Sequence, residues 1–119
     1  MSITMYHNPR CSKSRKTLEL LQQSGIEPRI VEYLGTPPNA AETLRIAELI
    51  GVRVADLLRR GEDEFRQADD LPNLDDDAAL AKWLESHPKV IERPIVVDED
   101  NERAVIGRPP ENVLELVGG

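Results

Sequence analysis

The chain has 119 residues, enough for one buried core but too few for two, so we expect a single domain spanning residues 1–119. Its formal net charge of −7 argues against nucleic acid as the main partner, because nonspecific binding to phosphates needs a basic face. The first residues reach a cysteine and several charges without a long apolar run, so we expect no signal peptide, no membrane contact and a cytoplasmic location.

A strand, a helix and a second strand are predicted for the first third of the chain. Residues 2–6 alternate between apolar and polar side chains, which predicts a short strand, and residues 7–9 predict a turn. Helical spacing of apolar side chains follows Cys11, and Gly25 is placed to end that helix. Residues 29–34 predict the second strand. About 30 residues of this pattern are typical of a right-handed parallel crossover.

The middle of the chain, about residues 39–86, is predicted to be a mostly helical insertion. Asn39, with a glutamate three residues later, is typical of a helix start, and Gly51 of its end. A helical turn around Leu57 and a helix over residues 76–85 should follow. The side chains expected to face inward are Leu44, Ala47, Ile50, Leu80, Trp83 and Leu84.

A hairpin and a closing helix are predicted for the last third. Residues 95–97 and 104–106 are short apolar runs separated by turn-forming residues, and Pro109 with Pro110 opens a helix. Together with the first third, this order predicts an α/β domain of thioredoxin-like fold, with the helical insertion placed between the second strand and the hairpin. The Arg93–Pro94 pair fits, since a proline entering a strand there is often cis and faces the reactive thiol.

Cys11 is the candidate nucleophile. It closes a strand-to-helix turn, where unpaired backbone N–H groups and the helix dipole favour a thiolate. Arg10 and Lys13 add positive charge nearby, and the Ser14 hydroxyl lies one turn on, able to donate to the sulfur. The same helix end is suited to a tetrahedral oxyanion. The alternative is a buried cysteine that only packs.

Cys11 is also the only cysteine in the sequence, so an internal disulfide cycle is excluded. Where a CxxC redox pair would place its second thiol, the chain has Ser14. A redox reaction would therefore need an external thiol, most simply glutathione, and a glutaredoxin-type recycling partner. One cysteine and two distant histidines give no recognisable ligand spacing, so we expect no metal, and His87 is interpreted as structural.

Four motifs in order, HNPRCSKSR, LLRRG, ERPIVV and IGRPPE, resemble the glutathione- and glutaredoxin-dependent arsenate reductase family, or ArsC family, over nearly the whole chain. The resemblance is greatest to a short subgroup without a long carboxyl-terminal extension. It implies a thioredoxin-like fold with no bound cofactor. It further implies that Cys11 attacks arsenate to give a thioarsenate, that glutathione joins as co-substrate, and that arsenite is released.

The resemblance also implies roles for individual residues. The family's cysteine falls on Cys11, and its supporting histidine and serine fall on His7 and Ser14. Several guanidinium groups suit arsenate, because a doubly charged anion must be neutralised before a thiolate approaches its central atom. The family's three oxyanion arginines fall on Arg59, Arg93 and Arg108, with Arg60 an alternative to Arg59.

Two other functions stay open at this point. Spx-type regulators share this fold family and bind RNA polymerase instead of turning over arsenate, but they often carry the CxxC motif that is absent here. A second possibility keeps the reactive cysteine and the arginines but acts on another oxyanion or on a glutathione mixed disulfide.

Overall fold

The computed structural model describes residues 2–117, and the chain divides into two compact units. Unit 1 consists of residues 1–33 and 93–119, and unit 2 of residues 34–92. Unit 2 is therefore inserted in the sequence of unit 1 and contains the segment predicted to be a helical insertion. That the two units together constitute one domain stays a prediction.

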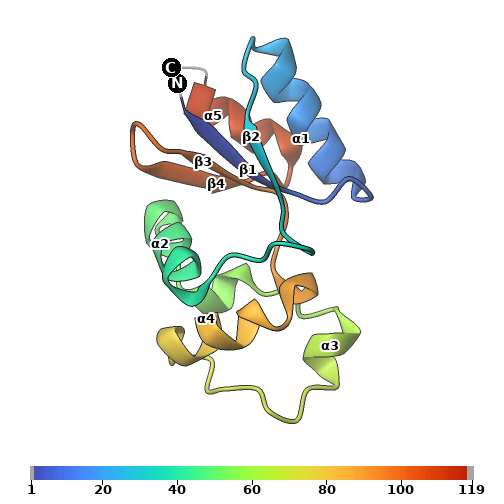
Figure 1. The fold of residues 1–119 in the computed structure, drawn as a ribbon, viewed down its shortest axis with the longest axis vertical. Helices are drawn as coiled ribbons and strands as arrows, with labels where there is room; N and C mark the ends of the chain where they lie inside the picture. The colour runs from blue at the N-terminus through green and yellow to red at the C-terminus, as the bar shows by residue number, and fades with distance from the viewer. Residues whose placement is uncertain (1, 118–119) are drawn as a thin grey trace. The chain divides into compact units, whose positions relative to one another are not determined.

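A four-stranded sheet of order β2-β1-β3-β4 forms the centre of unit 1 (Figure 1). The first two strands are parallel, β3 runs antiparallel to β1, and β3 and β4 form an antiparallel hairpin. This confirms the predicted thioredoxin-like α/β fold, with its parallel crossover and its carboxyl-terminal hairpin. The strands are β1 (Ile3–His7), β2 (Arg29–Glu32), β3 (Ile95–Asp98) and β4 (Arg103–Ile106).

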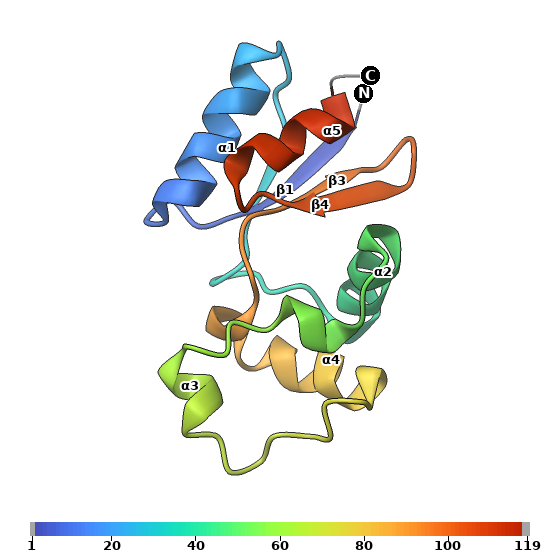
Figure 2. The same cartoon turned by 180° about the vertical axis from the view of Figure 1, so that it is seen from behind.

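Helix α1 (Ser12–Gln23) and helix α5 (Leu114–Val117) cover one face of this sheet (Figures 1 and 2). A 3₁₀ helix, η3 (Pro110–Val113), leads into α5. Because strand side chains alternate between faces, the odd-numbered residues of β1 point towards these helices. The resulting core cluster contains Ile3, Met5, Leu21, Val96, Val113 and Leu116.

The first strand and the first helix differ little from their predictions. His7, predicted to lie in a turn, is the last residue of β1, because the parallel ladder continues to the pair His7↔Glu32. Helix α1 starts directly after Cys11, and Gly25 adopts the left-handed conformation (φ 81°) expected of a residue that ends a helix. The Arg93–Pro94 peptide bond is cis, as is Arg108–Pro109.

Unit 2 is helical, as predicted. The Asn39 side chain accepts a hydrogen bond of 2.8 Å from the Glu42 N–H, and Gly51 (φ 89°) ends the helix that follows. The helices of this unit are α2 (Ala40–Ile50), α3 (Asp63–Arg66) and α4 (Asp77–Glu85), with 3₁₀ helices η1 (Val54–Leu57) and η2 (Pro88–Val90).

Two details of unit 2 escaped prediction. Leu44 and Ile50 are only half-buried, and the buried side chains of α2 are Thr43, Ile46 and Ala47. The buried face of α2 is therefore rotated around the helix axis relative to the predicted apolar face. Helix α3 was not predicted because none of its residues is buried, so no apolar periodicity marks it.

Among residues 2–117, no helix is long and apolar enough to cross a membrane.

Gly107 marks a close approach of the chain after β4 to helix α1. A Cβ atom at this position would lie 2.6 Å from the Thr17 Oγ1 and 2.8 Å from the Pro94 Cγ. The Gly107 N–H donates a 2.9 Å hydrogen bond to the Pro94 carbonyl. Since both neighbours are themselves held in place, the segment leaving β4 can lie against α1 and Pro94 only without a side chain here.

Gly107→Ala should therefore lower the free energy of unfolding by about 1–3 kcal/mol through overpacking, measured by urea denaturation. Gly61→Ala is the matched control, because a Cβ at Gly61 would meet no atom within 4 Å. Equal unfolding midpoints for the two variants would contradict this account of Gly107.

Candidate functional site

Three loops of unit 1 leave the sheet at the same end. Strand β1 ends at His7, β3 begins at Ile95 and β4 ends at Ile106. The registers Tyr6↔Ile95 and Ile95↔Ile106 place these three strand ends side by side. The loop after β1 carries Cys11, and the other two carry Arg93 and Arg108, so the topology brings together side chains that are far apart in the sequence.

The loop that presents Cys11 is organised by Asn8, which is buried. Its carbonyl accepts a 3.0 Å hydrogen bond from the Cys11 N–H, and its side-chain oxygen accepts one of 3.0 Å from the Arg10 N–H. The Arg15 guanidinium donates to the Pro9 carbonyl at 3.0 Å. Asn8 was not among the predicted site residues, although an Asn-Pro pair in a strand-to-helix turn is a recognisable signal for a side chain that folds onto its own backbone.

Cys11 occupies the position just before the first residue of α1, in an extended conformation (φ −92°, ψ 123°), and is partly exposed. Burial is the largest influence on its thiol and raises the pKa, but it is outweighed by the backbone N–H groups of Ser14 and Lys13 and by the Arg93 guanidinium. The pKa of Cys11 is consequently held below its ordinary value. A thiolate at this place is thus favoured by the helix end, as predicted from sequence.

The Arg93 and Arg108 guanidinium groups both lie at the sulfur. Arg93 lowers the pKa of Cys11 as a hydrogen-bond donor and as a positive charge. The Arg108 Nη1 lies 3.9 Å from the Cys11 Sγ and donates to the Arg93 carbonyl at 3.3 Å. A thiol with two cations beside it at a helix start is an arrangement typical of sites that bind an oxyanion.

His7 and Ser14 form a buried pair beneath the loop. The Ser14 Oγ lies 2.7 Å from the His7 Nδ1 and accepts a 3.1 Å hydrogen bond from the Asn8 N–H. Burial is the main cause that lowers the pKa of His7, and the nearby Glu32 carboxylate opposes it. The sequence predicted that the Ser14 hydroxyl is able to donate to the sulfur. In the structure this hydroxyl contacts the imidazole, and the Ser14 backbone N–H acts on the sulfur.

Known proteins share the sequence pattern and the fold of this chain. The model of the ArsC family matches residues 6–116. The chain belongs to the ArsC family. Arsenate reductase of Haemophilus influenzae is 45% identical over 98% of this chain and 100% of that protein. An Escherichia coli arsenate reductase is 39% identical over 98% of this chain and 81% of that protein. The structure of arsenate reductase from Vibrio cholerae is similar with a TM-score of 0.85, 43% identity and 97% coverage of both chains.

The third arginine implied by the ArsC resemblance, Arg59, belongs to unit 2. There its guanidinium contacts Glu62 and Glu92, each with a nitrogen–oxygen distance of 3.4 Å. The neighbouring Arg60 is exposed. That Arg59 or Arg60 binds an oxyanion together with Arg93 and Arg108 stays a prediction.

His87, interpreted as structural, also lies in unit 2. Its ring stacks on Trp83 with a centroid distance of 4.0 Å, and its Nδ1 lies 2.9 Å from the Trp83 carbonyl oxygen. Within residues 2–117 there is no group of three or more His, Cys, Asp or Glu side chains placed to hold a metal ion.

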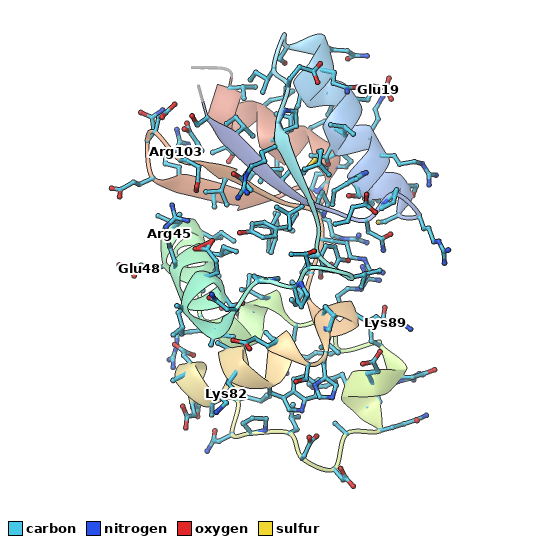
Figure 3. The ribbon with its side chains drawn as sticks, viewed as in Figure 1. Glu19, Arg45, Glu48, Lys82, Lys89 and Arg103 are labelled. Atoms are coloured by element: carbon cyan, nitrogen blue, oxygen red, sulfur yellow. The ribbon has the colours of Figure 1, made fainter. Side chains whose placement is uncertain are left out.

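The rate at which iodoacetamide alkylates Cys11 should rise with pH around a midpoint below the roughly 8.5 of an ordinary cysteine. Arg93→Ala should move that midpoint upward, because the thiolate loses a hydrogen-bond donor and a positive charge. Arg103→Ala is the control, since Arg103 lies at the turn end of the hairpin (Figure 3). A wild-type midpoint at or above the ordinary value, unchanged by Arg93→Ala, would mark Cys11 as an ordinary thiol.

His7 should titrate below the roughly 6.5 of an ordinary histidine, because burial disfavours the imidazolium ion. Its ring protons, followed by NMR against pH, report the midpoint. Glu32→Gln should lower the midpoint further, because Glu32 raises the pKa of His7, whereas Glu27→Gln, at an exposed position in the loop before β2, should leave it unchanged. A midpoint that rises in Glu32→Gln would contradict this assignment.

Proposed function

We propose that the chain reduces arsenate to arsenite, with Cys11 as the nucleophile. The observation that carries the proposal is the placement of two guanidinium groups, from Arg93 and Arg108, at the thiol that starts α1. The names of the relatives from Haemophilus influenzae and Vibrio cholerae support arsenate as the substrate. An oxyanion bound by these arginines would have its central atom within reach of the sulfur.

In the first step, the Cys11 thiolate attacks the arsenic atom. A sulfur–arsenic bond forms, and one arsenate oxygen leaves as water after taking up protons. Arsenate carries negative charge that repels a thiolate, so Arg93 and Arg108 neutralise the oxygens before and during the attack. The backbone N–H groups at the start of α1 bind both the thiolate and the anion. Arg59 is proposed as a third oxyanion ligand.

Reduction then needs electrons from outside the chain. Conversion of arsenate to arsenite takes two electrons, which two thiols supply when they are oxidised to one disulfide. Cys11 is the only cysteine, so the second thiol comes from another molecule. We propose that glutathione, as co-substrate, displaces a second arsenic oxygen as water and bonds to the arsenic of the thioarsenate. Glutaredoxin then removes the glutathione as a mixed disulfide, which leaves the electron pair of the sulfur–arsenic bond on arsenic, and hydrolysis releases arsenite from Cys11. A single free thiol also fits a reducing compartment, so we propose that the protein is cytoplasmic. We also propose that it works without a bound cofactor.

His7 and Ser14 support the nucleophile in this proposal through the loop. The hydroxyl ties the end of β1 to the first turn of α1, because it contacts the His7 ring and accepts from the Asn8 N–H. The Ser14 N–H that stabilises the thiolate belongs to the same residue. A neutral imidazole, kept neutral by burial, fits this contact with the hydroxyl.

Arsenate-dependent oxidation of NADPH, coupled through glutathione, glutaredoxin and glutathione reductase, measures this activity. We expect turnover by the wild type, and none above background for Cys11→Ser, because a serine hydroxyl is far less ionised than a thiol. Arg93→Ala and Arg108→Ala should each lower kcat/KM by about 10- to 1000-fold. Their unfolding midpoints should stay close to that of the wild type.

Arg103→Ala should match the wild type in activity. Substantial turnover by Cys11→Ser would contradict the mechanism. An inactive wild type with a reactive, low-pKa thiol would instead favour a thiol regulator or an enzyme acting on a different oxyanion or mixed disulfide.

A further inference from the structure

Asn112 lies where the chain turns from β4 into the carboxyl-terminal helix, and its side-chain amide spans the loop that carries Arg108. Its Nδ2 donates to the Ile106 carbonyl at 3.2 Å and to the Arg108 carbonyl at 3.2 Å. Its backbone N–H donates to the Pro109 carbonyl at 3.0 Å. One partly buried amide group thus joins the last residue of β4 to Arg108, two residues further along the chain.

The Arg108 side chain needs such an anchor. Its guanidinium is held on the sulfur side by contacts that are long for hydrogen bonds, 3.9 Å to the Cys11 Sγ and 3.3 Å to the Arg93 carbonyl. An arginine has many rotamers, and a contact of 3.3 Å or longer restricts them only weakly. The position of the charge therefore depends on how firmly the backbone of Arg108 is fixed.

The backbone of this loop is held from two directions. On one side, the Gly107 N–H donates to the Pro94 carbonyl at 2.9 Å, and Gly107 packs against Thr17. On the other side, the Asn112 amide reaches past Gly107 and donates to the Arg108 carbonyl. Without the amide, the two carbonyls lose a shared donor. The Arg108 N–H still donates to the Ile106 carbonyl at 2.9 Å, but the Arg108 carbonyl loses the hydrogen bond from Asn112.

We propose that Asn112 is a positioning residue that holds the Arg108 guanidinium beside the Cys11 sulfur. Asn112 touches neither the sulfur nor an oxyanion, and it acts through the backbone of Arg108. The placement of charge at the thiol is independent of the substrate. Only the consequence for arsenate rests on the proposed function.

The charge beside the sulfur is measured by comparing two alkylating reagents, anionic iodoacetate and neutral iodoacetamide. Both react with the same thiolate, so the ratio of their rate constants at one pH does not depend on the fraction of Cys11 ionised. A guanidinium close to the sulfur attracts iodoacetate and raises the ratio. Asn112→Ala and Asn112→Leu, the second of which keeps the branched shape of the side chain without its amide, should lower the ratio by about two- to tenfold.

Asn101→Ala is the matched control. Asn101 lies at the opposite end of the same hairpin, where its Nδ2 donates to the Asp98 carboxylate at 2.8 Å. The substitution removes an asparagine amide from the same part of the chain without touching the Arg108 loop, so the ratio should stay at the wild-type value. A drop in Asn101→Ala equal to that in Asn112→Ala would overturn the proposal, because both would then report general loosening of the hairpin.

A double-mutant cycle with Arg108→Ala separates positioning from general stability. If Asn112 acts through Arg108, the double variant Arg108→Ala/Asn112→Ala should have the same ratio as Arg108→Ala alone. Additive losses, or an unchanged ratio in Asn112→Ala and Asn112→Leu, would overturn the proposal. Circular dichroism checks the fold of each variant. Should both fail to fold, Asn112→Ser, which retains one hydroxyl donor, takes their place in the cycle.

The arsenate concentration that half-protects Cys11 from iodoacetamide adds the link to function, and it should rise about three- to tenfold in Asn112→Ala. A protein that arsenate fails to protect, but whose alkylation ratio falls in Asn112→Ala, would lose its proposed substrate and keep Asn112 as a positioning residue. A ratio that does not fall would remove Asn112 and leave the proposed function standing.

Discussion

The balance between burial and hydrogen bonding at the Cys11 sulfur is the constraint on which the site depends. Burial raises the pKa of the thiol, whereas the N–H groups of Ser14 and Lys13 and the Arg93 guanidinium lower it. The N–H groups are available because the first turn of a helix leaves its donors unpaired. They reach the sulfur only if Cys11 is the residue immediately before the helix, a position that the hydrogen bonds of Asn8 hold from the other side.

The sheet supplies the rest of the site. Because β3 and β4 run antiparallel to their neighbours, the loop before β3 and the loop after β4 emerge at the end of the sheet where β1 finishes. Arg93 and Arg108 are carried by these loops, directly before cis prolines. Gly107 lets the second loop approach α1, and Asn112 joins that loop to the strand it leaves. The cations are thus placed by strand register and backbone contacts, and the long side chains need to adjust only locally.

Local signals made much of the fold predictable. Asn39 and Gly51 bounded a helix because capping and left-handed termination involve neighbours in sequence, and Gly25 did the same for α1. Features that depend on contacts between residues far apart in sequence were harder to predict. His7 belongs to the strand because of its pairing with Glu32, which no local pattern contains. Helix α3 buries no residue, so it left no periodic signal.

The same distinction between local signals and long-range contacts applies to the candidate site. The role of Cys11 at a helix start was predicted from the residues next to it. Arg93 and Arg108 were assigned only through resemblance to a family, because they lie far from Cys11 in sequence and no local pattern shows that they are close to it in the fold. The partner of the Ser14 hydroxyl depends on which polar group is near in the folded chain, and this is the His7 Nδ1, at 2.7 Å. Asn112 had no signal of its own, since an asparagine near the start of a helix is common and only the fold places it against Ile106 and Arg108.

The net charge of −7 and the positive charge beside Cys11 coexist in this chain because the two act over different distances. At physiological ionic strength, exposed charges more than about 8 Å apart are largely screened from one another, so carboxylates farther than this from Cys11 contribute little to the potential at its sulfur. Direct contacts within a partly buried site are screened much less. The first turn of α1 contains no acidic residue, and two guanidinium groups lie at the sulfur. The sign of the site is therefore set by its immediate neighbours, and the bulk charge mainly affects how fast an anion arrives.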